Sequence, residues 1–272
     1  MSGVCRGLRD RYRAFRARSL AEVRLLALFC DAIYLPVRPE GPKEGVLVAW
    51  GFTTTGERVL LDVCLGQRER TEDWLDLGQG LLRRGLRSPL LVVADGAPGL
   101  VRAIGELWPE ADRQRCSVHR LRNVLAKLPK RPGLHERVRS AYWAALDGAS
   151  SPAEAEQRLR SLVGSLEREY PSAAARLAED LPALTAHLAY PLRLKRRLRS
   201  TNLLERSLEE VRRRTKVIGR FPGETSCLTL AWAVMDLVIA GAKGLGLTLS
   251  ERHAIAVIVA DRAAPRTGES VA

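Results

Sequence analysis

The chain has 272 residues and an ordinary hydrophobic content of 46%, which excludes wholesale disorder and permits a sizeable core. Its net charge of +13 and isoelectric point near 10.2 indicate a polyanionic partner, most often nucleic acid. A solvated basic surface in an arginine-biased proteome is the plainer alternative.

The first half of the sequence predicts an α/β core. Residues 1–24 form a basic, partly helical lead-in, followed by strands over residues 25–38, 46–52 and 58–65, the last two joined by a hairpin. Residues 72–85 predict a helix that ends at Gly85 and whose apolar side holds Trp74, Leu77, Leu81 and Leu82. A buried strand over 89–95, a helix ending near residue 108 and a short strand over 112–116 follow. This order is typical of a mixed sheet with helices packed on it.

The strand signal ends at about residue 118. Residues 118–198 predict helices divided by proline-containing breaks, and residues 226–242 predict a further apolar helix. The chain after about residue 262 is polar and is expected to fray. Trp74 and Trp232 stand at helical spacing with aliphatic residues, which predicts that both lie in the core. Core packing is also favoured for Tyr142 and Trp143, with stacking on a distorted DNA base as the alternative.

Residues 199–221 combine a helix start, one carboxylate and a dense basic tail. Ser200, Thr201 or Asn202 can cap the helix, and Glu205 follows Asn202 by three residues, as a capping box requires. Residues 193–220 hold eleven Lys and Arg against three Glu, a local net charge of +8.

The spacing along this helix separates an apolar face from a charged one. At about 100° per residue, one face collects Leu204, Leu208, Val211 and Thr215, with Glu205 at its border and Arg212 two turns further along. On the surface, Glu209 and Glu210 have partners four residues on, Arg213 and Arg214, which predicts ion pairs.

Five cysteines, at positions 5, 30, 64, 116 and 227, are odd in number, and three lie in or beside apolar strand-like runs. This usage fits buried thiols in a reducing compartment better than a disulfide framework. The apolar run 25–30 is too short for a secretory signal, and residues 226–242 are too short and too polar for a membrane span. We therefore expect a cytoplasmic protein.

Three carboxylates stand where core building alone does not require them. Asp31 interrupts a buried strand, Asp95 lies at the carboxyl end of another, and Glu205 begins a helix that can cross that edge of the sheet. Converging acids repel one another unless divalent cations bind between them, and Mg²⁺ prefers such oxygen ligands. The alternatives are a structural buried acid for Asp31, a helix cap for Asp95 and a capping-box residue for Glu205.

Four stretches carry a family resemblance over roughly residues 10–240: LFCDAIYLPVR, EDWLDLGQGLLRRGLRSPLLVVADGAPGL, RCSVHRLRNVLAKLP and STNLLERSLEEVRRRTKVIGRFP. Together they resemble the catalytic part of Mutator-type bacterial insertion-sequence transposases, which are DDE enzymes with an RNase H-like fold. The resemblance places the catalytic and metal-binding acids at Asp31, Asp95 and Glu205, with two Mg²⁺ or Mn²⁺ ions. It implies an RNase H-like mixed sheet flanked by helices over residues 25–117 and 199–245, and an all-helical insertion over 118–198 before the last catalytic helix. Residues 1–24 and 246–272 are then a lead-in and a C-terminal tail.

The implied function is DNA transposition: metal-dependent strand cleavage followed by strand transfer, on double-stranded DNA, as a homodimer or higher multimer and without a small-molecule cofactor. The basic residues expected to hold the DNA backbone near the metals are Arg212, Arg213, Arg214, Lys216 and Arg220. A metal-dependent nuclease on the same fold and an inactive DNA-binding remnant are the alternatives. Relatives carry a long amino-terminal DNA-binding region, whereas about thirty residues precede Asp31 here, so a truncated copy is a further expectation.

Cys116, His119 and Asn202 also match family motifs. Two ligands do not make a zinc site, which normally needs four, and the other histidines are scattered along the chain. A packing or hydrogen-bonding role beside the active site is therefore favoured for Cys116 and His119 over metal binding.

Overall fold

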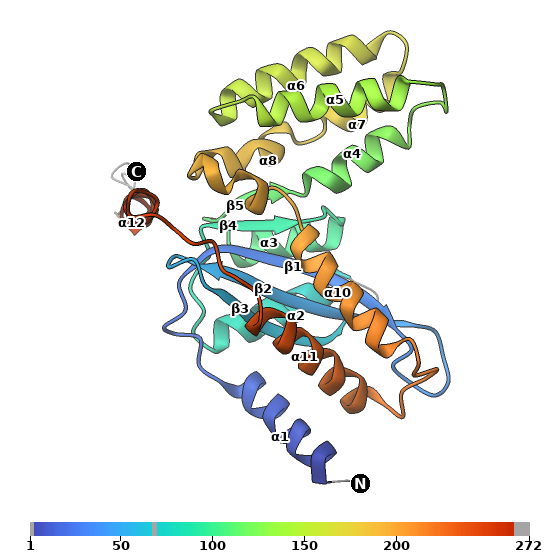
Figure 1. Ribbon diagram of the computed structural model, residues 1–272, viewed down its shortest axis with the longest axis vertical. Coiled ribbons are helices and arrows are strands. Elements are labelled where there is room, and N and C mark those ends of the chain that lie inside the picture. Colours follow the sequence, from blue (N-terminus) through green and yellow to red (C-terminus); the bar gives the residue numbers. More distant parts are fainter. Residues whose placement is uncertain (1–2, 67–69, 264–272) are drawn as a thin grey trace, which may run out of the picture.

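A five-stranded mixed sheet forms the centre of the computed structural model, which describes residues 3–66 and 70–263 (Figure 1). The strand order is β3-β2-β1-β4-β5, with β1, β2 and β3 antiparallel neighbours and β4 and β5 parallel to β1. The strands are β1 Leu25–Leu35, β2 Glu44–Thr53, β3 Arg58–Gly66, β4 Leu91–Ala94 and β5 Asp112–Arg115. The predicted α/β class is confirmed.

Helices precede, separate and follow these strands. The α-helices are α1 Gly3–Ala17, α2 Thr71–Arg83, α3 Pro98–Leu107, α4 Ser117–Leu125, α5 Leu134–Asp147, α6 Pro152–Glu167, α7 Pro171–Ala178, α8 Leu181–Thr185, α9 Lys195–Leu198, α10 Asn202–Thr215, α11 Glu224–Ala240 and α12 Leu249–Ala263. Two 3₁₀ helices, η1 Ala186–Ala189 and η2 Leu192–Leu194, join α8 to α9. Gly85 has a φ of +90° just after α2, as expected of a helix-ending glycine, whereas Leu82 is 38% exposed and lies outside the predicted apolar side.

Each face of the sheet packs on its own set of helices, because side chains alternate along a strand. On one face, Ala27, Phe29 and Ile33 share a core with residues of α1, α10 and α11. On the other face, Leu28 and Cys30 share a core with α2 and α3. Figure 1 shows α10 and α11 side by side across the first of these faces. The face of a strand residue therefore decides whether it meets α10.

The expected core tryptophans are confirmed, since Trp74 and Trp232 are 2% and 3% exposed. Trp232 packs against Tyr12 and Phe15 of α1, with ring centroids 5.9 and 5.7 Å away. The amino-terminal helix thus shares the main core, although it has none of its own.

The helices between β5 and α10 build a second, separate hydrophobic cluster from residues between 121 and 188. This bundle lies beyond the β5 edge of the sheet (Figure 1). Tyr142 is fully buried in it and donates a hydrogen bond to the Ser117 carbonyl at 2.9 Å, which confirms its core position. The Ser117 amide donates to the Arg199 carbonyl at 2.9 Å, so the two ends of the bundle meet. Consequently α4 and α10 begin side by side.

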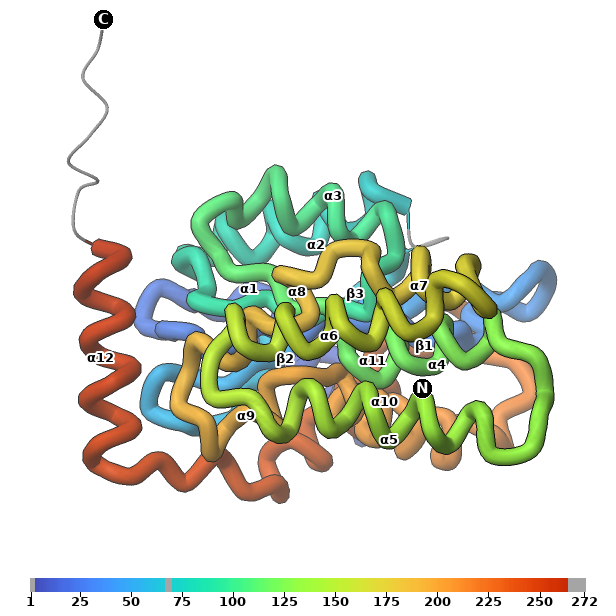
Figure 2. The backbone as a smooth tube through the Cα atoms, turned by 90° about the horizontal axis from the view of Figure 1, so that it is seen from above, coloured from blue at the N-terminus to red at the C-terminus, as the bar shows by residue number. Residues whose placement is uncertain are grey.

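The carboxyl-terminal helix α12 stands at one side of the molecule (Figure 2). It is held there by Ile255, which is 1% exposed, and by Arg262, whose guanidinium lies 2.6 Å from Asp112 Oδ2. No helix in the described part of the chain combines the length and the apolar character needed to cross a membrane. The tail expected to fray lies mostly in residues 264–272, outside the described residues.

Candidate active site

Asp31 on β1 and Asp95, which directly follows β4, occupy equivalent positions along two neighbouring parallel strands. The β1–β4 ladder pairs Phe29 with Val93, and each aspartate follows its paired residue by two positions. Because two residues return a strand to the same face, both carboxylates belong on the face covered by α10. Strand register therefore places the two predicted acids together.

The backbone holds both aspartates locally. Asp31 Oδ1 accepts a hydrogen bond from the Ala32 amide at 2.8 Å, and Asp95 Oδ1 accepts from the Ala97 amide at 2.9 Å. Burial raises the pKa of Asp31 to about 7, and the carboxylates of Asp95 and Glu205 add to the rise. Asp95 is not the helix cap, since Ala97 precedes α3 and Asp95 caps only the turn before it. The three acids thus lie within electrostatic reach of one another.

The start of α10 differs from the predicted capping box. The residue preceding the helix is Thr201, so Asn202 is the first helical residue and Glu205 stands one position too late for that motif. The Thr201 hydroxyl instead lies 2.9 Å from Glu205 Oε1. The predicted apolar face is confirmed, because Leu204, Leu208, Val211 and Thr215 are all buried. This packing presses α10 against the sheet and leaves Glu205 at the border of the buried face.

A cavity of about 200 Å³ opens over this border, and both Asp31 and Glu205 line it. Arg212 lines it from two turns further along α10, as its position on the stripe predicted. Arg122 and Glu209 also line it and were missed in the sequence. Arg122 follows His119 by three residues in α4, so helical spacing puts both on one face and was the available signal.

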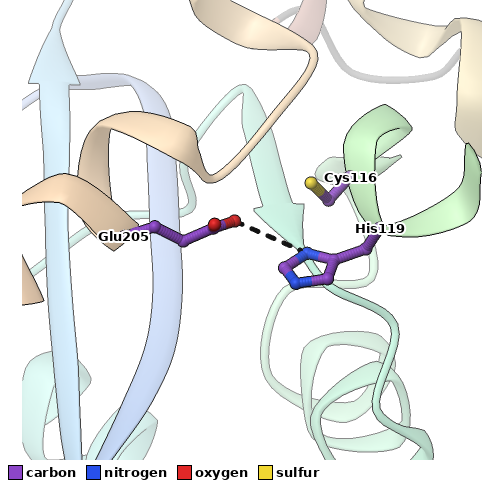
Figure 3. Close-up of side chains that lie close together, drawn as sticks. All are labelled: Cys116, His119 and Glu205. Atoms are coloured by element: carbon purple, nitrogen blue, oxygen red, sulfur yellow. Dashed lines mark ion pairs between the residues drawn. The ribbon is translucent and has the colours of Figure 1, made fainter. Parts of the chain in front are cut away.

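Cys116, His119 and Glu205 come together although Glu205 follows His119 by 86 positions in the chain (Figure 3). His119 Nδ1 lies 3.6 Å from Glu205 Oε1, and Cys116 Sγ lies 3.4 Å from the Thr201 hydroxyl and 3.5 Å from its amide nitrogen. Interaction with the Cys116 thiol raises the pKa of His119. Burial of Cys116 opposes ionisation, but the neighbouring His119 and Thr201 lower the pKa of the thiol overall. Cys116 and His119 therefore make polar contacts with Thr201 and Glu205 at the start of α10.

The predicted DNA-binding residues of α10 and the following loop are exposed. Arg213 and Arg214 both pair with Glu210, at 2.7 Å, so the predicted pairing of Glu209 with Arg213 is wrong. A second cavity of about 640 Å³, between α10 and the β1–β2 connection, is lined by Arg212, Arg213, Lys216 and Arg220. Arg212 borders both cavities and so connects the acidic site with the basic surface.

None of the five cysteines forms a disulfide, and four are buried, whereas three were predicted to lie in or beside apolar runs. Cys5 is the exposed one. The described structure therefore holds thiols and no disulfide framework.

Comparison with known proteins gives one consistent result. The sequence pattern of a family described as "Transposase, Mutator family" matches residues 1–238. The transposase for insertion sequence element IS6120 of Mycolicibacterium smegmatis is 34% identical over 233 residues, which cover 85% of this chain and 71% of that protein. The transposase for ISRM5 of Rhizobium meliloti is 37% identical over 86% of this chain and 58% of its own length. The transposase for IS1081 of Mycobacterium tuberculosis is 35% identical over 93% of this chain and 61% of its own length. The chain thus spans between 58% and 71% of these three relatives.

Proposed function

This chain belongs to the Mutator family of transposases, and we propose that it cuts and joins DNA strands as an insertion-sequence transposase. One observation carries the proposal. Asp31 on β1 and Asp95, just after β4, each follow the paired residues Phe29 and Val93 by two positions, and Glu205 lines the same cavity as Asp31 from the helix that covers this face. This is the arrangement that an acidic phosphoryl-transfer site requires.

The fold supports assignment to the RNase H-like class. Three antiparallel strands followed by two parallel ones, in the order β3-β2-β1-β4-β5, fit the sheet that the resemblance implies, and α10 fits its last catalytic helix. The separate hydrophobic cluster over residues 121–188 supports treating residues 118–198 as a helical insertion.

The donor set fits hard divalent cations such as Mg²⁺ or Mn²⁺. All three candidate ligands offer carboxylate oxygens, and mutual repulsion contributes to the raised pKa of Asp31. Cations bound there would neutralise the acids and supply an activated oxygen nucleophile together with charge stabilisation for an in-line displacement. Asp31, Asp95 and Glu205 are the residues that would hold them.

The basic residues that line the two cavities would bind and orient DNA. Arg212 and Arg122 would contact backbone phosphates at the mouth of the acidic site, and Lys216 and Arg220 would extend the contact along the second cavity. In cleavage, a water oxygen attacks phosphorus and the bond to the 3′ oxygen breaks, which frees a 3′-hydroxyl. In strand transfer, that hydroxyl attacks a target phosphodiester and displaces the target's own 3′ oxygen. We also propose that the protein acts on DNA in the bacterial cytoplasm, as a homodimer or higher multimer on paired DNA ends.

A strand-transfer assay tests this function. The purified chain is incubated with a pre-cleaved DNA end of its own element, plasmid target and Mn²⁺, beside Glu205→Gln and the surface control Glu106→Gln on α3. We expect joined product from the wild type and Glu106→Gln only. Cleavage without joining would favour a nuclease, and DNA binding without either reaction would favour a non-catalytic remnant.

A further inference from the structure

Three side chains of different chemistry converge at the junction of the bundle and the sheet. Ligand atoms of Cys116, His119 and Glu205 all lie within 4.8 Å of one another (Figure 3). Among residues 3–66 and 70–263, no other three His, Cys, Asp or Glu side chains bring their ligand atoms together in this way. The sequence concealed the group, because its third member is a glutamate on α10 and not another cysteine or histidine.

We propose that Cys116, His119 and Glu205 bind a thiophilic divalent cation of the Zn²⁺ class. A tetrahedral ion with bonds of about 2.0–2.3 Å holds its ligand atoms about 3.3–3.6 Å apart. His119 Nδ1 and Glu205 Oε1 are already 3.6 Å apart. Nδ1 is also buried, and the His119 side chain interacts with both other members of the group, Cys116 and Glu205. Small side-chain movements suffice to close the site.

A second layer of contacts orients these ligands. The Thr201 hydroxyl lies within hydrogen-bonding distance of both Cys116 Sγ, at 3.4 Å, and Glu205 Oε1, at 2.9 Å. The Thr201 amide also donates to the sulfur at 3.5 Å. Fully buried Thr201 therefore holds two ligands from different elements in a fixed relation, which is how metal sites are pre-organised.

The site has a closed side and an open side. Cys116 is fully buried, whereas His119 and Glu205 line the cavity of about 200 Å³. Three protein ligands and a water from the cavity complete a four-coordinate zinc site with one exchangeable position. A thiolate selects a softer ion than Mg²⁺, which prefers oxygen ligands. The two sets of ligands share Glu205, and this site differs from the all-carboxylate set in Cys116 and His119.

Cobalt binding to the full chain, measured without DNA, tests the site separately from the proposed function. All proteins carry Cys5→Ser, which removes the exposed thiol. We expect one Co²⁺ per chain, with visible absorption of a tetrahedral ion and a near-ultraviolet thiolate-to-cobalt charge-transfer band. Stoichiometric Zn²⁺ should displace the Co²⁺, and an excess of Mg²⁺ should not.

Matched variants locate the ligands. Cys116→Ser should remove the charge-transfer band, whereas Cys64→Ser, a buried thiol on β3, and Asp31→Asn should retain it. If circular dichroism shows that Cys116→Ser is unfolded, Glu205→Gln serves instead and should weaken Co²⁺ binding by about tenfold or more. The absence of a charge-transfer band, its survival in Cys116→Ser or its loss in Asp31→Asn would each overturn the inference and leave Cys116 and His119 as a hydrogen-bonded contact.

Discussion

The two halves of the candidate active site are positioned by different forces. Asp31 and Asp95 stand on β1 and just after β4, where strand register and hydrogen bonds to their own neighbouring amides fix them. Glu205 stands on α10, where it contacts Thr201 at the start of the same helix and His119 on α4, at the other end of the helical bundle. The sheet half therefore depends on the backbone and the helix half on side chains.

This difference determines what a substitution changes. In the sheet half, an amide can replace a carboxylate without moving the backbone that carries it. In the helix half, the same contacts position Glu205 and close the two ends of the bundle, so function and stability change together.

Asp95→Asn tests the sheet half and carries the largest expected effect. The amide oxygen can still accept from the Ala97 amide, so unfolding in urea should change by less than about 1 kcal/mol. Loss of a cation ligand should lower metal-dependent cleavage and strand transfer at least a hundredfold. Retained activity would remove Asp95 from the mechanism, and gel-shift binding of DNA is the control for folding.

The pH dependence of His187 tests the contact between the helical bundle and the sheet. It is fully buried, with its amide 2.8 Å and its Nδ1 3.0 Å from Gln114 Oε1 on β5. Burial, reinforced by the positive charges of Arg199 and Lys195, lowers its pKa to about 3.

Between the folded pKa and the ordinary value of about 6.5, only the unfolded state binds this proton. The contribution of His187 to the free energy of unfolding is therefore fully present above about pH 6.5. Below that pH, the free energy of unfolding should fall by about 1.4 kcal/mol per pH unit. His187→Asn can keep the donor to Gln114 and should remove this contribution in urea titrations between pH 7 and 5. Equal pH slopes for the two proteins would mean that His187 titrates normally in the fold.

Thr201→Val tests the side-chain contacts of the helix half. The isosteric change removes a buried hydroxyl that lies beside Cys116 and Glu205, and should destabilise the protein by about 1 kcal/mol. Strand transfer should fall with it, because Glu205 loses one of its two orienting partners. Thr201→Ser restores the hydroxyl and should recover both properties; a fully active Thr201→Val would show that Glu205 needs no such support.

Arg212→Ala should have the smallest effect of these substitutions, and the effect should be on DNA binding. Arg212 lines both cavities, so its removal tests whether DNA contacts the protein between them. Loss of one phosphate contact should weaken DNA binding less than about tenfold and reduce the slope of log affinity against log salt by about 1. Arg160→Ala, an exposed arginine of α6 paired with Glu156, is the matched control and should leave the slope unchanged.

The sequence by itself determined the sheet, its flanking helices and the apolar face of α10, because these follow from local periodicity of apolar residues. Asp31 and Asp95 were identifiable for the same reason: a carboxylate inside or at the end of an apolar strand stands out against its neighbours. The cap of α10 was predicted only as Ser200, Thr201 or Asn202, and the capping box with Asn202 is wrong, because all three are good caps and local pattern does not choose among them.

Only the tertiary structure decided what surrounds Glu205. The chain between His119 and Glu205 folds into a bundle with its own core, and the meeting of its two ends is a long-range event that no local pattern encodes. That closure brings Cys116, His119 and Arg122 to the carboxylate. It turns a short motif of two side chains into a site of three ligands, because proximity across the bundle depends on packing and not on spacing along the chain.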